Sequence, residues 1–296
     1  MVGATLLFAT MTLCVKLAST DYSTGEIVFY RGVVGALMMA LLTRKQGGTL
    51  YTNVPALHFR RSLTGVSSLA LWFYAIAQLP LATAVTLNYM SPIWMALLLL
   101  GGSFLLGTGR AGRVSAWLVA AVFTGFAGVV CVLQPAMARD QLLGGLMGLL
   151  SGLFAAMAYM QVSALGGAGE PDGRVVFYFS IGSAAGGALM AMLADGWHAH
   201  TAQGLWALLA VGVLATLAQL LLTRAYRTGN MLVNASLQYL GIVWAFLYGV
   251  LLFDDPVTVL SVLGMSLIAL AGITAARLRQ PHAIRKNENT FPGFPG

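Results

Sequence analysis

The fold class is decided by long apolar runs such as residues 205–222, which read LWALLAVGVLATLAQLLL and contain no charged residue. A predominantly apolar stretch of about 18 or more residues can cross the hydrocarbon of a bilayer as a helix. Working outward from this run, we expect ten such segments, at residues 2–19, 24–43, 62–79, 82–101, 115–134, 144–164, 175–193, 203–225, 229–252 and 256–277. Strands of a β-barrel would appear as alternating segments of about ten residues. The sequence therefore predicts an all-α integral membrane protein.

The composition of the 296-residue chain agrees with lipid as the main solvent. Hydrophobic residues make up 58% of the chain and charged residues 8%, whereas a soluble domain carries about 25% charged residues. The net charge is +7, but the basic residues lie in short loops and form no patch with interleaved aromatics, so nucleic acid is not an expected partner. The expected partners are the lipid bilayer and a small-molecule substrate. A monomer is the simplest assembly compatible with these features.

The distribution of Lys and Arg predicts that both termini are cytoplasmic. With the N-terminus inside, thirteen of the sixteen basic residues fall in inner loops or in the C-terminal tail. The outer loops then hold only Arg139, and Lys16 and Arg31 lie within spans. Cytoplasmic loops of membrane proteins carry the excess of positive charge, so this bias favours the orientation with both ends inside.

An internal repeat is indicated by matched stretches in the two halves of the chain. Residues 88–94 of the fourth segment read NYMSPIW, and residues 238–244 of the ninth read QYLGIVW. Weaker matches relate the second segment to the seventh and the fifth to the tenth. Because five is odd, a repeated five-helix unit enters the membrane from opposite sides, as in alternating-access carriers. We therefore expect inverted repeats at residues 1–140 and 141–279, followed by a disordered cytoplasmic tail at 280–296.

Three stretches carry a resemblance to a known family. They are FYRG at residues 29–32, the fourth segment from Asn88 to Leu100 with Ser91-Pro92, and LGMSLI at 263–268 followed by Ala271-Gly272. On these residues the chain resembles the ten-helix, EamA-type branch of the drug/metabolite transporter superfamily. Where that family often has Gly-Glu after the fourth and ninth helices, this chain has Gly107-Thr108 and Asp254-Asp255. In the ninth segment, Gly241 replaces the proline.

The resemblance implies a multi-pass transporter of a bacterial inner membrane that exports small organic metabolites, with amino acids as the leading class. Sugars, nucleotide precursors and drugs are the alternative cargoes, with import as well as export open, and a membrane protein without transport activity is the alternative outside this class. An enzyme is not expected, because the four histidines fall in expected loops or the tail and no metalloprotease motif is present. No cofactor or metal site is expected.

Candidate substrate-binding residues are polar or aromatic side chains on helix faces that could line a central cavity. Asn88 and Gln238 are matched across the repeats near the middle of their spans. The alternative is that such polar groups bond neighbouring helices, and that the aromatic residues pack or anchor the interface. The complete set is Thr12, Trp72, Tyr74, Asn88, Tyr89, Ser91, Gln161, Asn234, Gln238 and Tyr239.

Three charged residues are predicted to act in gating: Lys16, Glu26 and Arg31. Lys16 lies only about 5 Å from the outer end of its span, so its side chain could also reach the interface. Arg31 lies about 10 Å deep, where an ionised group indicates function. Glu26 is the candidate partner of Lys16. With no acidic residue or histidine expected at the midplane, we predict a facilitator. The competing hypothesis is that Glu26 and Lys16 exchange a proton.

Overall fold

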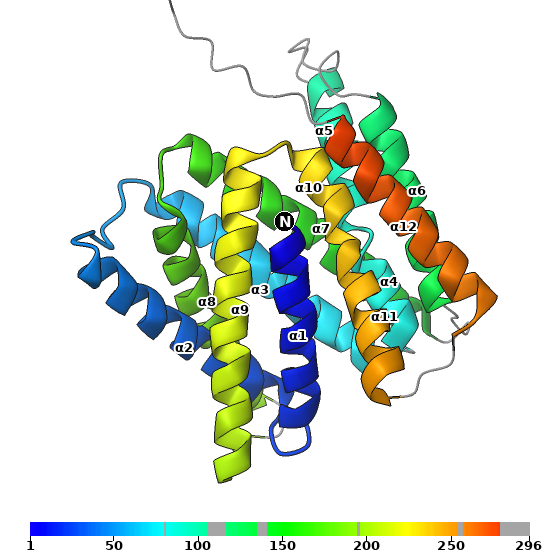
Figure 1. The fold of residues 1–296 in the computed structure, drawn as a ribbon. Helices are drawn as coiled ribbons and strands as arrows, with labels where there is room; N and C mark the ends of the chain where they lie inside the picture. The colour runs from blue at the N-terminus through cyan, green and yellow to red at the C-terminus, as the bar shows by residue number, and fades with distance from the viewer. Residues whose placement is uncertain (80, 106–115, 135–140, 194–195, 254–256, 279–296) are drawn as a thin grey trace, which may run out of the picture.

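The structure is a computed structural model that describes residues 1–79, 81–105, 116–134, 141–193, 196–253 and 257–278. The predicted tail, the boundary at residue 140, Gly107-Thr108 and Asp254-Asp255 lie outside the described residues. Over the described ranges the chain forms helices and no strand (Figure 1). The helices are α1 Val2–Ala18, α2 Thr24–Lys45, α3 Pro55–Gln78, α4 Leu81–Asn88, α5 Ser91–Leu105, α6 Ala116–Leu133, α7 Leu142–Gly167, α8 Asp172–Leu193, α9 Ala202–Thr228, α10 Met231–Gln238, α11 Leu240–Phe253 and α12 Val259–Arg277.

Eight stretches of the described chain are long and apolar enough to cross a membrane. They fall in eight of the ten expected segments, with α4–α5 and α10–α11 each acting as one stretch. The expected first segment lies in α1, whose apolar part, Val2–Val15, is shorter. The expected third segment lies in α3, which is outside this set. The all-α membrane fold is thus confirmed, while the number of ten spans stays a prediction.

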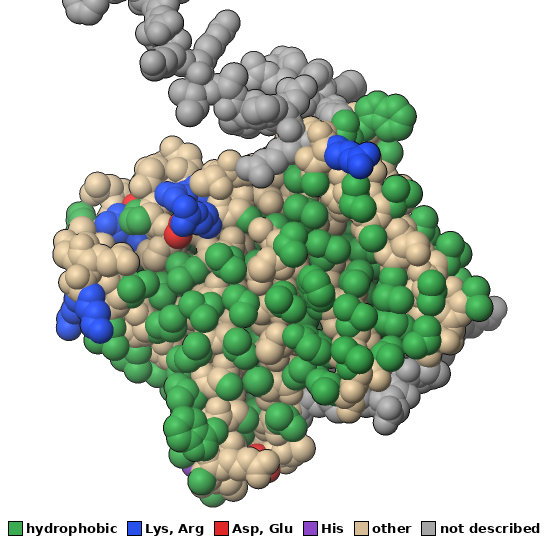
Figure 2. Space-filling model, in the orientation of Figure 1, with side chains coloured by type: hydrophobic (Ala, Val, Ile, Leu, Met, Phe, Trp, Pro, Cys, Tyr) green, Lys and Arg blue, Asp and Glu red, His purple; other side chains and the backbone are tan. Residues whose placement is uncertain are grey.

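The surface of the molecule is apolar where lipid would meet it. Hydrophobic side chains cover the middle of the face drawn in Figure 2, and Lys and Arg gather toward its upper end. The side chains of Val259, Leu193 and Leu251 are 89%, 78% and 74% exposed. Apolar exposure on this scale marks a protein surface that is covered by something other than water, which is what a bilayer supplies.

Two of the expected spans are interrupted near their middle. The fourth expected span breaks between α4 and α5 at Tyr89-Met90, and the ninth breaks between α10 and α11 at Tyr239. Pro92 lies in the first turn of α5, where its missing N–H costs no helical bond. The break at Tyr239 occurs without a proline. There the chain tightens, because the Tyr239 N–H donates to the Ser236 carbonyl at 3.3 Å.

Four helix pairs make the most extensive contacts: α2 with α8, α3 with α7, α1 with α9, and α6 with α12. Glycines let two of these pairs approach backbone to backbone. A Cβ on Gly32 of α2 would overlap the backbone of Ala184 in α8. A Cβ on Gly128 of α6 would lie 2.6 Å from the carbonyl oxygen of Gly264 in α12, and the reverse also holds. Small residues at such crossings are typical of membrane helices.

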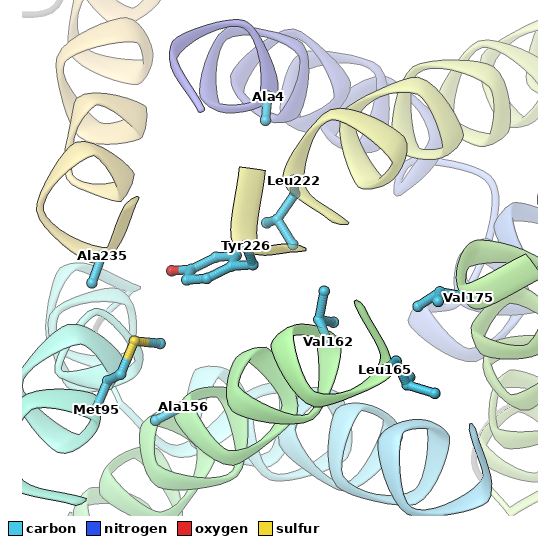
Figure 3. Packing of buried hydrophobic residues seen from close by; sticks show 9 residues of the cluster. All are labelled: Ala4, Met95, Ala156, Val162, Leu165, Val175, Leu222, Tyr226 and Ala235. Carbon is cyan, nitrogen blue, oxygen red and sulfur yellow. The ribbon is translucent and has the colours of Figure 1, made fainter. Parts of the chain in front are cut away.

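The main buried cluster lies where helices from both halves of the chain meet. Its members come from α1, α5, α7, α8, α9 and α10, and they are Ala4, Met95, Ala156, Val162, Leu165, Val175, Leu222, Tyr226 and Ala235. The ring of Tyr226, fully buried, projects into the middle of this cluster from α9 (Figure 3). The centre of the molecule is therefore largely apolar, and the polar groups at its edge stand out.

Candidate functional site

The two helix breaks bring together two of the predicted residues. The rings of Tyr89 and Tyr239 stack with centroids 6.3 Å apart and planes inclined by 27°. Gly241 makes room for this contact, because a Cβ there would lie 2.8 Å from the Tyr89 hydroxyl. Tyr239 is fully buried, and its hydroxyl has no hydrogen-bond partner in the described part of the chain. The matched tyrosines of the two halves thus face each other inside the protein.

A second aromatic pair contacts Gln238, the residue before the α10–α11 break. The rings of Tyr159 in α7 and Tyr226 in α9 stack at 5.1 Å with planes only 4° apart. The Tyr226 hydroxyl donates to Gln238 Oε1 at 3.2 Å, and Gln238 Nε2 donates to the Tyr159 hydroxyl at 3.4 Å. Gln238 therefore links three helices at the edge of the central cluster.

Asn88, the counterpart of Gln238, has different partners. Its Nδ2 donates to Ser151 Oγ of α7 at 3.0 Å, and Ser151 Oγ donates to the Gly148 carbonyl at 2.6 Å. Ser91, three residues later, is fully buried, and its hydroxyl is unpaired within the described residues. Asn88 thus joins α4 to α7 and is separate from the Gln238 network.

Two further candidates bond to neighbouring segments. Asn234 Nδ2 donates to the Ala225 carbonyl at 2.6 Å and so ties α10 to the end of α9. Gln161 Oε1 accepts a hydrogen bond from Thr64 of α3 at 2.8 Å. Both side chains satisfy helix–helix contacts, the role that the alternative interpretation assigns to them.

The remaining candidates are not brought to this network. Thr12 is exposed and bonds to the Phe8 carbonyl of its own helix at 2.9 Å. Tyr74 is 43% exposed. Trp72 is half-buried, and its Nε1 has no partner among the described residues.

Two arginines lie beside the same phenylalanine. Arg31 lines a small pocket between α2, α8 and α9, together with Gly32, Phe179, Ser180, Ser183, Ala215, Thr216 and Gln219. The pocket has room for about one water molecule. The guanidinium of Arg61, from α3, lies 4.1 Å from the centroid of the Phe179 ring, in a cation–π arrangement. Arg61 is only 3% exposed, and its Nε and Nη1 have no hydrogen-bond partner within the described chain.

Tyr159 connects these groups. Its side chain lies within electrostatic range of Arg31, Arg61 and Tyr89, and the two arginines repel each other. The residues Tyr159, Tyr226 and Arg61 were not among those predicted from the sequence. For Arg61 a signal existed: Pro55 is suited to the first turn of a helix, and α3 indeed begins there. This earlier start places Arg61 inside the helix and not in the expected loop.

At one end of the molecule, a carboxylate closes the start of α2 against the connection between α8 and α9. Glu26 is fully buried and forms a capping box with Ser23. Its Oε1 accepts from the His198 backbone N–H at 2.7 Å, and its Oε2 lies 2.7 Å from His198 Nδ1. Among the described side chains the partner of Glu26 is His198; the Lys16 side chain lies outside the described residues, so its pairing with Glu26 stays a prediction. We call Ser23, Glu26 and His198 the opposite-end cluster.

At the other end, where the connections α2–α3 and α7–α8 lie, a second buried carboxylate has more partners. Glu170 accepts from Thr52 at 2.9 Å and lies 3.1 Å from both His58 Nε2 and Arg174 Nη1. Burial alone would raise the pKa of Glu170, but the hydrogen bonds from His58, Thr52 and Arg174, with the charge of Arg174, hold it below its ordinary value. The expectation that His58 lies in a loop was wrong, because α3 begins at Pro55. These four residues form the basic-end cluster.

These features define the class of the protein. The described helices, the apolar surface and the buried polar groups are those of a multi-pass integral membrane protein. Residues 1–134 match the EamA-like transporter family. The chain also resembles a solved crystal structure with a TM-score of 0.81 over 94% of this chain and 95% of the other, at 19% identity, which shows a shared fold.

Relatives extend the match over nearly the whole chain. The chain is 32% identical over 277 residues to the pseudopaline exporter CntI of Pseudomonas aeruginosa, with 94% of each chain covered. It is 31% identical over 287 residues to an uncharacterized transporter of Helicobacter pylori, with 92% of each covered. The chain belongs to the EamA-like transporter family of the drug/metabolite transporter superfamily. It is therefore a transporter of the bacterial inner membrane.

Proposed function

We propose that the protein exports small organic metabolites by alternating access, through a central cavity between two inverted five-helix repeats with both termini in the cytoplasm. Amino acids are the leading cargo, and sugars, nucleotide precursors and drugs are the alternatives. The exporter of Pseudomonas aeruginosa supports export of a small metabolite. The transport pathway would lie within one chain, so a monomer suffices.

The observation that carries this proposal is the pair of broken helices, α4–α5 and α10–α11, whose breaks bring Tyr89 and Tyr239 face to face. Substrate sites of inverted-repeat carriers form where interrupted helices meet at the midplane. The helix pairing agrees with such a repeat. If the second half begins with α7, then α1, α2, α3 and α6 correspond to α7, α8, α9 and α12. Under this correspondence the α1–α9 pair becomes the α7–α3 pair, and the α2–α8 and α6–α12 pairs each join a helix to its own counterpart.

A counterflow experiment tests the proposal. Proteoliposomes loaded in turn with unlabelled amino acids, sugars or nucleosides would receive the same labelled compound outside. Transient accumulation with at least one class is the expected result, and amino acids should give the largest signal. No counterflow with any class would contradict metabolite transport. Accumulation with sugars or nucleosides alone would overturn the amino-acid assignment.

The binding role of the matched polar pair has its own test. We infer that Gln238 helps to bind substrate, because it links Tyr159 and Tyr226 beside the breaks, and that Asn88 does so at the matched place in the other half. Losing a hydrogen-bond partner in a dry site costs about 1–3 kcal/mol. Gln238→Leu and Asn88→Leu should therefore reduce counterflow roughly tenfold or more, while leaving folded yield intact. Normal flux in both variants would contradict the binding role.

A further inference from the structure

Arg31 and Arg61 approach each other from opposite ends of the molecule. Arg31 lies seven residues after Thr24, the start of α2, and Arg61 lies six residues after Pro55, the start of α3. At 1.5 Å per residue, both lie roughly 10 Å inside their helices. Because α3 begins at the end where α2 finishes, the two arginines lie about equally far inside opposite ends of the molecule. Phe179 lines the pocket of Arg31, and its ring lies under the guanidinium of Arg61.

The two guanidinium groups lack a counter-charge within the described chain. Neither forms an ion pair there: Glu170 is bound by Arg174 and His58, and Glu26 by His198. The charged or titratable groups that act on Arg61 are Tyr159 and Arg31, and Arg31 repels it. Burying one unpaired ion costs several kcal/mol, and an arginine at membrane depth marks a functional site by default.

The surroundings of the pair are built to hold the guanidinium of Arg61 in place. A Cβ on Gly65, one turn further along α3, would overlap Arg61 Nη1 and lie 2.7 Å from the Phe179 ring. The absence of a side chain at this position lets the guanidinium lie flat over the phenylalanine. The N–H groups of its Nε and Nη1 have no hydrogen-bond acceptor within the described residues. In the pocket of Arg31, the Ser183 hydroxyl is also buried and unpaired among the described residues.

We propose that Arg31 and Arg61, with Phe179 and Tyr159 beside them, form an anion subsite that binds a carboxylate of the exported metabolite. The planar fork of a guanidinium matches the two oxygens of a carboxylate. A bound carboxylate supplies the missing counter-charge and removes the repulsion between the arginines. This subsite deepens the proposed export function and rests on it: the cargo carries an acidic group, as amino acids do, whereas nucleosides and neutral sugars do not.

The experiment compares amino acids with their carboxamides, which keep the side chain and lose the negative charge. Wild-type protein, Arg31→Gln, Arg61→Gln and Arg61→Lys would be measured by counterflow and by thermal unfolding in detergent with each compound. The matched control is Arg60→Gln, because Arg60 is the exposed neighbour of Arg61. Inorganic phosphate, the other common oxyanion, is included in the unfolding series.

We expect amino acids to raise the unfolding temperature of the wild type and of Arg60→Gln, and the carboxamides and phosphate to have little effect. Removing a charged hydrogen-bond donor should weaken the amino-acid response roughly tenfold or more in Arg31→Gln and Arg61→Gln. Arg61→Lys should retain part of it. Without ligand, the Gln variants should unfold no earlier than the wild type, because they lose an unpaired buried charge. A purely structural arginine would instead destabilise the protein when removed.

The outcomes separate this inference from the export proposal. Equal responses to amino acids and carboxamides, no response of the wild type to any carboxylate, or a response to phosphate alone would overturn the carboxylate subsite. If carboxylates stabilise the wild type through both arginines while counterflow is absent, the subsite stands and the export proposal fails. If counterflow proceeds equally with acid and amide, export stands and the subsite fails.

Discussion

The two ends of the α2–α8 pair are closed by similar groups held in different ways. Each cluster buries a glutamate beside a histidine, Glu170 with His58 and Glu26 with His198. In the basic-end cluster, Glu170 also pairs with Arg174, whose charge is permanent, and both histidine and carboxylate are buried. In the opposite-end cluster, the partner His198 belongs to a connection and its side chain is 44% exposed.

This difference indicates which end opens more easily. Both glutamates are buried, but separating the basic-end cluster would break the contacts of Glu170 to Thr52 and His58 in addition to disturbing its pair with the permanently charged Arg174. Separating the opposite-end cluster requires the connection between α8 and α9 to move away from a glutamate that its own helix cap still supports. An exporter must open both ends in turn. We therefore expect the resting protein to be held more firmly at the basic end.

The largest expected effect comes from Glu170→Ala. The substitution leaves Thr52, His58 and Arg174 without their shared acceptor, and breaking a buried ion pair by removing one partner costs about 3–5 kcal/mol. Thermal unfolding of the purified protein in detergent measures the loss. Arg60→Ala, at an exposed position, is the control and should change stability by less than about 0.5 kcal/mol. Equal effects of the two substitutions would contradict the role given to the basic-end cluster.

A smaller effect is expected from Glu26→Gln. The amide keeps one oxygen to accept from His198 but loses the charge, and a hydrogen bond involving a charged group contributes about 1.5–3 kcal/mol. We expect a loss of about 1–2 kcal/mol, because the cap by Ser23 partly remains. A loss as large as that of Glu170→Ala would remove the distinction between the two ends.

The same variant tests energy coupling. In proteoliposomes with an imposed pH gradient and no substrate gradient, a facilitator shows no uphill accumulation, and that is the predicted result. Accumulation that a protonophore abolishes would refute it. Loss of this accumulation in Glu26→Gln would then assign proton exchange to Glu26, whose neighbour in the described structure is His198.

The smallest effect is a dependence of stability on acid pH. Because the pKa of Glu170 is lowered in the folded state from its ordinary value of 4.5, its contribution to the unfolding free energy is fully present above about pH 4.5 and is lost as the pH falls through the lower folded-state value. Unfolding temperatures recorded from pH 6 downward in the wild type should drop more steeply than in Glu170→Gln. The protonated acid still accepts hydrogen bonds, so the loss should be smaller than in Glu170→Ala. Parallel curves would show that Glu170 is not the titrating group.

Much of the fold followed from the sequence because lipid imposes a simple requirement. A helix in hydrocarbon must satisfy its own backbone hydrogen bonds, so apolar length alone located most of the helices. The break between α10 and α11 was not predicted, because no proline marks it. Beside this break, Gly241 admits the hydroxyl of Tyr89, which lies 152 residues earlier in the chain, and such a contact leaves no local signal.

The candidate site was predictable where a residue's chemistry was unusual for its depth. Arg31 was selected for its depth and lines a small pocket in the structure, and Tyr89 and Tyr239, selected from the repeat, lie face to face; their roles in transport stay predictions. Arg61 and His58 were missed because basic residues near a span end normally belong to a loop. Their burial depends on α3 starting seven residues before the apolar run begins, and on Glu170 arriving from the connection after α7.

The contact between Gly128 and Gly264 limits how the sequence can change over time. A Cβ atom added to either glycine would lie 2.6 Å from the carbonyl oxygen of the other. A methyl group added at either position would clash with the main chain of the other helix. Because every amino acid has the same main chain, no substitution at the facing residue can remove this clash. Related chains that keep this helix crossing should therefore hold glycine at both positions together, and a chain that has lost one should have moved the two helices apart.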